Sequence, residues 1–551
     1  MQSVKLSVTV RSNLARKYDA VGLTKIDAAV KRWIAADKKR WIDTIHVAVD
    51  DAVAMKALGT KPIEGRATAQ KVKRAIDALW PRVSPEYLVL FGAYDVVPYF
   101  VVANPSYDSS GDTDATVRTD NPYACSQPYR TSSINTYLVP DRVVGRIADA
   151  PGESDPIWFL DYLATATDWA SQPRKTYTGA YAICCDEWSG AGVECVQVIG
   201  EPVTRLMISP PEDDTSALAQ SRLGARLHMI KCHGAQLDPN FYGQKGNSFP
   251  VSLSSASLRK KVSQGTVAGA MCCYGAQVFS PVDEAVRPVG AWPIASTYLR
   301  GGGYGFAGST EIAWVGGPQK ACADWIVTGY LKSILGGASQ GRALLESKQD
   351  FMRWLAQQGS ALGRDDEKTL IEYVLLGDPA IQPVGVQPAV RAGVGAPRAA
   401  AGEAMAAMPS AVAVQERVQR RLFQAQLAAQ IREALPSRRD ARGAVRARAN
   451  QLFGLVDDLL GGEAEAFQLS KAKVRVDRLE TVFSRAQTVS AGFRAGLTGS
   501  ARRVALPARR ETFQFYWSGS RVVEGHLQIR LARVETDAQG RVLRTRVVQS
   551  S

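Results

Sequence analysis

Apolar and polar positions alternate along the first 384 residues in two different rhythms. The apolar residues of 24–39 recur at the spacing of one helix face; they are Ile26, Ala29, Val30, Trp33 and Ile34. The next segment, TIHVAVD (44–50), has the pattern of a strand. A second helical pattern over 66–80 leads into the apolar run YLVLFG at 87–92. The pattern therefore predicts alternating helices and strands.

Four more apolar runs, each followed by turn residues, continue the series. They are GAYAICC (179–185), LHMIKCHG (227–234), TVAGAMCC (266–273) and YGFAGS (304–309). Short apolar runs separated by helical segments are typical of a mostly parallel sheet that is covered by helices. We therefore predict an α/β fold with its functional site at the carboxyl ends of the strands.

The composition changes after residue 384 to a stretch rich in Ala, Gly and Pro, which is typical of a linker. Beyond it the pattern predicts an amphipathic helix over 412–435, a short apolar helix at QLFGLVDDLL (451–460) and strands from 511 onward, with a hairpin around Asp537–Gly540. We divide the chain into an N-terminal α/β subdomain (1–150), a second α/β subdomain (151–384), a linker (385–411) and a basic C-terminal α+β segment (412–551).

The net charge of +14 is concentrated in that last segment. Residues 411–551 hold 25 Lys and Arg against 13 Asp and Glu, whereas residues 1–390 hold 40 against 39. A basic excess suggests a nucleic-acid or membrane-surface partner. Because the first 390 residues are almost neutral, that suggestion does not extend to the α/β part.

Composition also bounds the class of protein. No apolar run is long enough to span a membrane, and the start of the chain lacks the apolar core of a secretory signal, so we expect a cytoplasmic protein. The eight cysteines are then expected to be reduced thiols. Their spacing does not match a zinc site, and we expect no metal.

Two of the predicted strands end in residues suited to nucleophilic chemistry. LHMIKCHG ends in His233 and Gly234, and TVAGAMCC ends in Cys272 and Cys273. One strand–helix–strand crossover fits between them, so we expect both ends at the same rim of the sheet as neighbours. A thiolate can attack an acyl carbon while an imidazole moves the proton. Another histidine, His228, lies inside a strand and is expected in the core.

These residues resemble a known family. His-Gly at one strand end and Cys-x-x-Gly at the next resemble the clan of cysteine peptidases that includes caspases, legumain and gingipains. Five further segments are similar, in the expected order, to elements of the gingipain-type peptidases: YLVLFGAYDVVPYF (87–100), TDNPYAC (119–125), VPDRVVGRIAD (139–149), FAGSTEIAW (306–314) and YVLLGDPAIQP (373–383). The resemblance implies a caspase-like α/β fold and peptide-bond hydrolysis by a Cys–His dyad, with no metal or other cofactor.

The resemblance also implies roles for individual residues. His233 takes the role of general acid and base, and the Gly234 N–H, with the N–H of the nucleophile, takes the role of oxyanion hole. The gingipain and legumain spacing, Cys-x-x-Gly, selects Cys272 as the nucleophile, whereas the caspase spacing, Cys-x-Gly, selects Cys273. We favour Cys272 and keep Cys273 as the alternative.

Substrate preference follows from the same resemblance. Gingipain-like members pair an acidic side chain after the first strand of this part with a basic P1 residue. By position relative to His233, Glu194 fits best here and Asp186 second, and both could hold a guanidinium group through charge-assisted hydrogen bonds. Trp314 matches the aromatic residue that lies over the P1 side chain in that family. We expect protein substrates with exposed Arg, or secondarily Lys.

The basic C-terminal quarter then acquires a second interpretation. Its segments PSRRDARGAVRARAN and LTGSARRVALPARRE are rich in bonds that such an enzyme would cleave. We expect a zymogen whose segment 412–551 is regulatory and is cut by an upstream activating protease or by the enzyme itself, in a signalling or defence cascade. The alternative is an inactive caspase-like scaffold whose basic module binds protein or nucleic acid. No RNA-binding or helix-turn-helix motif is present, so we expect neither a nucleic-acid nor a membrane partner.

Overall fold

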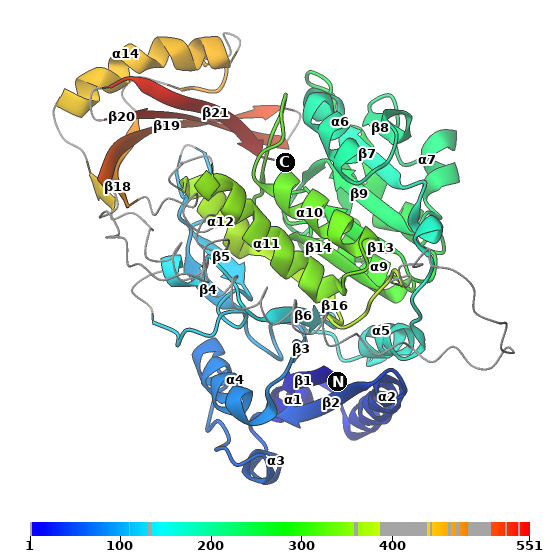
Figure 1. Cartoon of the computed structure of the whole chain (residues 1–551). Coiled ribbons are helices and arrows are strands. Elements are labelled where there is room, and N and C mark those ends of the chain that lie inside the picture. The colour runs from blue at the N-terminus through cyan, green and yellow to red at the C-terminus, as the bar shows by residue number, and fades with distance from the viewer. Residues whose placement is uncertain are drawn as a thin grey trace, which may run out of the picture.

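A sheet of ten strands forms the centre of the computed structural model (Figure 1). In order across the sheet they are β2 (Ile42–Ala48), β1 (Ser3–Thr9), β3 (Tyr87–Phe91), β6 (Val143–Ile147), β16 (Tyr373–Gly377), β14 (Gly305–Ser309), β13 (Val267–Ala270), β9 (Leu227–Lys231), β7 (Tyr181–Cys185) and β8 (Leu206–Ser209). The structure describes residues 3–109, 111–130, 134–357, 362–385, 438–440, 444–460, 464–469, 474–482, 509–523, 526–537 and 540–550.

Helices alternate with these strands along the chain. Those of the first 150 residues are α1 (Arg11–Lys17), α2 (Ala20–Lys39), α3 (Ala52–Ala57) and α4 (Ala69–Val83). Those that follow are α5 (Ile157–Asp168), α6 (Ser189–Val198), α7 (Ala217–Arg222), α8 (Ser255–Leu258), α9 (Ile294–Arg300), α10 (Ala323–Leu335), α11 (Gln340–Gln357) and α12 (Arg364–Glu372). The predicted α/β fold, with a mostly parallel sheet flanked by helices, is confirmed.

The sheet consists of two parallel blocks that run in opposite directions. β16 pairs in parallel with β6 but antiparallel with β14, so the direction reverses at the β16–β14 pair. β14, β13, β9, β7 and β8 are parallel to one another. Their carboxyl ends therefore share one rim, which is the rim that holds the predicted dyad.

Both faces of this second block are covered. Gly269 of β13 lies against Val327 and Leu331 of α10, on what we call the α10 face. His228 of β9 contacts Tyr298 of α9, on the opposite, α9 face. Strands covered on both faces read as continuous apolar runs, and that is why the sequence pattern found them.

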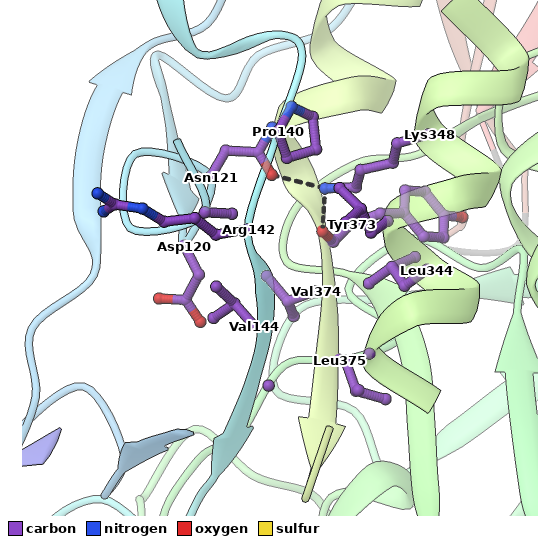
Figure 2. A pocket seen from close by; sticks show the side chains of 14 residues that line it. Asp120, Asn121, Pro140, Arg142, Val144, Leu344, Lys348, Tyr373, Val374 and Leu375 are labelled. Carbon is purple, nitrogen blue, oxygen red and sulfur yellow. Dashed lines mark hydrogen bonds between the residues drawn. The ribbon is translucent and has the colours of Figure 1, made fainter. Parts of the chain in front are cut away.

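Polar contacts at the junction of α11 with the first block surround a small hollow (Figure 2). The hollow measures about 30 Å³ and lies beside β6, β16 and α11. Lys348 of α11 donates hydrogen bonds to Asn121 Oδ1 at 2.6 Å and to Tyr373 O at 2.7 Å. Burial lowers the pKa of Lys348 to about 7. Next to it, Arg146 of β6 donates to both oxygens of the Asp120 carboxylate.

Four of the five segments that carry the family resemblance thus contribute to this junction or to the strands beside it. Residues 87–100, 119–125, 139–149 and 373–383 supply β3, Asp120 and Asn121, β6 and β16. Their chemistry here is that of buried, hydrogen-bonded polar groups. They support the sheet, and Tyr373, the first residue of β16, also lies opposite Ser309 at the carboxyl end of β14.

A second, antiparallel sheet is built mainly from the C-terminal segment. Its order is β15 (Trp314–Val315), β21 (Val542–Ser550), β20 (His526–Asp537), β19 (Arg509–Val523), β18 (Arg475–Val482) and β17 (Arg438–Asp440). The β20–β21 pair confirms the predicted hairpin, and α14 (Ala444–Leu459) contains most of the predicted short helix. The predicted linker 386–411 and helix 412–435 lie outside the described residues.

Side chains of this C-terminal sheet alternate between two apolar layers. Phe515, Trp517 and Val534 pack with α14 on one face. Tyr516 and Leu531 pack on the other face against the segment around Trp314. Figure 1 shows this sheet beside α12 and α10, with α14 on its outer side. Within the described residues, no helix combines the length and the apolar character that crossing a membrane requires.

Candidate active site

The structure brings the two predicted strand ends together. β9 and β13 are adjacent and parallel, with Ile230 opposite Ala270. Beyond this pair, Gly234 lies directly against the main chain of Cys273: a Cβ added to Gly234 would be 2.1 Å from the Cys273 carbonyl oxygen. Only glycine fits this approach. The expectation that the two ends are neighbours at one rim is confirmed.

The two adjacent cysteines lie on opposite faces of the sheet. The Cys272 thiol is fully buried, and its Sγ lies 3.8 Å from Ile230 O. The Cβ of Cys272 lies on the same side as that of Ala270, because a Cβ added to Gly275 would contact both. Gly269, which precedes Ala270, faces α10, so Cys272 lies on the α9 face. Burial raises the pKa of the Cys272 thiol well above its ordinary value. Such a thiol resembles a core side chain more than a nucleophile.

Cys273 follows one residue later and points the other way. Its Sγ accepts a hydrogen bond from the Ala313 N–H at 3.3 Å. Ala313 directly precedes β15. Gly316, the residue after β15, accepts a hydrogen bond from the ammonium group of Lys231, which lies on the α10 face. The Cys273 Sγ also lies 3.8 Å from Ala313 O, so both main-chain polar groups of Ala313 face the sulfur. Only 4% of Cys273 is exposed to solvent.

His233 lies on the same face as Cys273. The Trp188 ring contacts both the ammonium group of Lys231 and the imidazole of His233, whose centroid is 4.4 Å from the indole. His233 opens the short strand β10 (His233–Gly234), which pairs with β11 (Asn240–Tyr242). Its Nε2 is 2.8 Å from Gln244 Oε1.

The imidazole of His233 is neutral in this arrangement. Burial lowers its pKa to about 4, against a smaller opposing effect of the hydrogen bond to Gln244. A neutral imidazole can accept a proton, which is what a general base must do. The hydrogen bond between its Nε2 and the side-chain amide oxygen of Gln244 also fixes the orientation of the ring.

A buried ion pair beneath the rim fixes the loop after β15. Lys231 Nζ is 2.6 Å from Asp324 Oδ1, and neither side chain is exposed. The other oxygen of Asp324 accepts hydrogen bonds from the N–H groups of Gly316 and Ala321, both at 2.9 Å. The loop is therefore tied to the same face as His233.

The predicted specificity residues are not gathered in one place. Asp186 follows β7 directly at the carboxyl rim and is one-third exposed, with Lys245 Nζ 3.7 Å from its carboxylate. Glu194 lies on α6, and its carboxylate accepts a hydrogen bond from the Lys320 N–H at 3.3 Å. Trp314 is fully buried in the layer between Cys273 and the C-terminal sheet. Of the two carboxylates, Asp186 is the one on the strand-end rim.

Two further residues shape this site, and neither was predicted from the sequence. Gln244 holds the His233 ring from the β11–β12 turn, where β12 is Val251–Ser254. Asp114 accepts hydrogen bonds from Tyr274 OH at 2.7 Å and from the Ile312 N–H at 2.9 Å. Tyr274 has a φ of 54°, so Asp114 supports a left-handed residue directly after Cys273.

The C-terminal sheet covers this rim. Trp314 and Val315 of β15 pair with Ser550 and Gln549 of β21. Near His233, the ring of His526, at the start of β20, stacks on Phe249 with centroids 4.6 Å apart. His233 and Cys273 are therefore covered by a part of the chain that is remote in sequence.

A charged clasp attaches the same sheet to α12. Arg533 Nη1 lies 3.0 Å from Asp365 and 2.9 Å from Asp366, and Arg546 Nη1 lies 2.6 Å from Asp366. Cys322 completes a trio of buried, metal-type ligands with the two carboxylates. Because two guanidinium groups already neutralise these carboxylates, the trio is better described as an ion-pair cluster than as a cation site. We call Asp365, Asp366, Arg533 and Arg546 the clasp.

Comparisons with known proteins add little to this geometry. No protein-family model and no curated protein matches the chain. The chain is similar to a solved structure described as "Structure of Protease", with 14% identity over 70% of this chain and 79% of that chain and a TM-score of 0.46. A similarity this distant assigns neither an activity nor a site residue.

Proposed function

We propose that this protein is a cysteine endopeptidase in which His233 and Cys273 form the dyad. The observation that carries the proposal is their placement: both lie on the α10 face at neighbouring carboxyl strand ends, where Gly234 touches the Cys273 main chain. Cys272, which the Cys-x-x-Gly spacing favours, has its thiol on the opposite face. The geometry thus supports the alternative spacing, Cys-x-Gly.

The chemistry follows from these groups. His233 accepts the Cys273 proton, and the thiolate attacks the carbonyl carbon of the scissile bond. The N–H groups of Gly234 and Cys273 stabilise the negative oxygen of the tetrahedral intermediate. His233 then protonates the departing amine. In the second step the same imidazole deprotonates a water molecule, which hydrolyses the thioester. No group other than these residues and water is needed for the atom balance.

We further propose a preference for Arg or Lys at P1, with Asp186 as the recognising carboxylate. Asp186 is at the strand-end rim and is partly exposed, as a side chain that meets substrate must be. Its present neighbour is the ammonium group of Lys245, which occupies the position that a substrate cation would take. Glu194 is the weaker candidate because its carboxylate faces the main chain of Lys320.

The form described here is proposed to be latent. Extended peptides bind to sheet edges through main-chain hydrogen bonds, and β15, beside the thiol, has its edge filled by β21. The clasp and the layer around Trp314 hold the C-terminal sheet over the dyad. Cleavage in the Arg-rich C-terminal segment, or displacement of the sheet, would expose Cys273 for reaction.

Paired cysteine variants of the full chain test this function. After limited trypsin treatment, we expect Cys273→Ala and His233→Ala to lose at least about a thousandfold in cleavage of Arg-P1 peptides, as removal of a nucleophile or base does in dyad enzymes. Cys272→Ala is the matched control and should retain activity. Full activity in Cys273→Ala would refute the dyad. An inactive wild-type chain that binds no Arg-chloromethylketone at Cys273 would identify a scaffold instead.

A further inference from the structure

An open groove in the N-terminal subdomain is lined by cations and lies far from the dyad. It measures about 840 Å³ and lies between the loop 59–64 and α4. Lys61, Lys71, Arg74 and Arg82 line it, against a single carboxylate, that of Glu64. Figure 1 shows α3 and α4 at the end of the molecule opposite the C-terminal sheet. The groove is therefore independent of the proposed peptidase site.

The cations of the groove are not neutralised by the protein. Within the described part of the chain, no carboxylate lies within ion-pair distance of Lys61, Arg74 or Arg82. Lys71 Nζ donates to the carbonyl oxygens of Glu64 at 2.6 Å and Arg66 at 3.1 Å, which leaves its charge uncompensated.

Lys73, two residues after Lys71 on α4, shows the contrast. Lys73, which is buried beside the cation-lined face, pairs with Asp77 at 2.9 Å, and Arg142 pairs with the same carboxylate at 2.6 Å. The cations that face the protein interior thus have an acidic partner, whereas those that face the groove do not. Uncompensated cations around one hollow attract a ligand with several negative charges.

The floor of the groove adds an apolar component. Its apolar lining consists of Pro62, Ile63, Ala75, Ala78 and Pro81. The volume is in the range of small-ligand sites, which combine an apolar surface with a few charged groups. Arg74 and Arg82 are suited to phosphate groups because the guanidinium fork binds two oxygens at once.

We propose that this groove binds a nucleoside polyphosphate, with its phosphates on Arg74, Arg82 and Lys61 and its base on the apolar floor. The charge complementarity of the lining argues for a phosphate ligand, and the floor argues for an attached ring system. A shorter anion would meet fewer of the cations and is expected to bind more weakly.

Calorimetric titration of the full chain with ATP, pyrophosphate, AMP and adenosine tests the proposal. We expect saturable binding of ATP, with AMP about tenfold weaker and adenosine not binding, since each lost phosphate removes charge-assisted hydrogen bonds. Arg74→Ala combined with Arg82→Ala should weaken ATP at least about tenfold. Lys25→Ala combined with Lys31→Ala removes two exposed charges from α2 of the same subdomain and should leave the affinity unchanged.

Each contrary result overturns the proposal. Equal affinity for ATP and adenosine would show that the phosphates are not recognised. Unchanged ATP binding in the Arg74/Arg82 variant, or no binding at about 1 mM ATP, would exclude the groove as the site. Binding of a poly-glutamate peptide in place of ATP would assign the groove to an acidic protein partner. Thermal unfolding of both double variants verifies that they are folded.

Discussion

Each face of the main sheet holds a histidine and a cysteine that lie within β9 or just after β9 and β13, in different surroundings. On the α9 face, both ring nitrogens of His228 have partners: Tyr298 OH is 2.6 Å from Nδ1, and Ala225 O is 2.9 Å from Nε2. The Cys272 thiol is enclosed beside Ile230. All hydrogen-bonding capacity of this histidine is used, as in an ordinary core residue.

On the α10 face the pair lies just beyond the regular strands. His233 holds Gln244 through Nε2, and the Cys273 thiol receives the Ala313 N–H. Gly234 lies directly against the Cys273 main chain. The comparison shows that residue type does not distinguish a core histidine and cysteine from those of the proposed site. The face of the sheet and the loops beyond the strand end do.

The largest expected effect comes from opening the α10 face alone. Asp365→Asn combined with Asp366→Asn leaves Arg533 and Arg546 buried without carboxylates, whereas the asparagine at 366 still caps the Gly363 N–H. Breaking buried ion pairs in this way costs about 3–5 kcal/mol. We therefore expect iodoacetamide to label Cys273 at least about a hundredfold faster, with no change at Cys272.

Site-resolved mass spectrometry measures both cysteines in the same sample, so Cys272 is an internal reference. Arg541→Ala serves as the matched variant, because Arg541 pairs with Asp537 within the C-terminal sheet and is largely exposed. It should leave both labelling rates unchanged. Equal acceleration at Cys272 and Cys273 would mean global unfolding and would contradict the difference between the faces.

The sequence predicted the strands of the second block well because covered parallel strands are continuous apolar runs. It also predicted that the ends of LHMIKCHG and TVAGAMCC are neighbours, since one crossover joins them. It did not predict which cysteine shares a face with His233. That depends on the register between β9 and β13, and alternation within one strand carries no information about its partner.

Long-range contacts account for what else the sequence missed. Gln244 and Asp114 act from loops whose sequence has no periodicity, and each reaches its partner only because the chain folds back. The reversal of strand direction at β16 is likewise a property of the connections. The hairpin of β20 and β21 was readable from its turn residues, whereas its position over the dyad depends on side chains such as Arg533 and Asp366.

A smaller effect is expected from acid. Burial lowers the pKa of both His228 and His233 to about 4, so the unfolded chain takes up each proton near pH 6.5 and the folded chain does not. The free energy of unfolding contributed by each histidine therefore falls as the pH drops from 6.5 toward 4. His228→Asn should lower the free energy of unfolding at neutral pH. At pH 5 this loss should be about 2 kcal/mol smaller, because the wild-type histidine has lost that contribution whereas Asn does not titrate.

Denaturant unfolding of wild type and variant at both pH values measures this difference. His233→Asn should behave alike in the covered form. In the Asp365→Asn, Asp366→Asn background, the shrinkage should persist for His228→Asn and disappear for His233→Asn, since only the α10 face becomes hydrated. A pH-independent loss for His228→Asn in the wild-type background would show that the pKa of His228 is the same in the folded and the unfolded chain.

The smallest expected effect separates the two histidine partners. Tyr298→Phe removes the hydroxyl from His228, and Gln244→Met removes the amide from His233 at nearly constant volume. Each should lower the free energy of unfolding by about 1–2 kcal/mol, the usual loss for an unsatisfied buried group. Only Gln244→Met should also lower kcat of the trypsin-released enzyme, by about tenfold, because the imidazole is no longer held for proton transfer. A matching fall of kcat in Tyr298→Phe would mean that the α9 face takes part in the chemistry, and the division between a core histidine and a catalytic one would no longer hold.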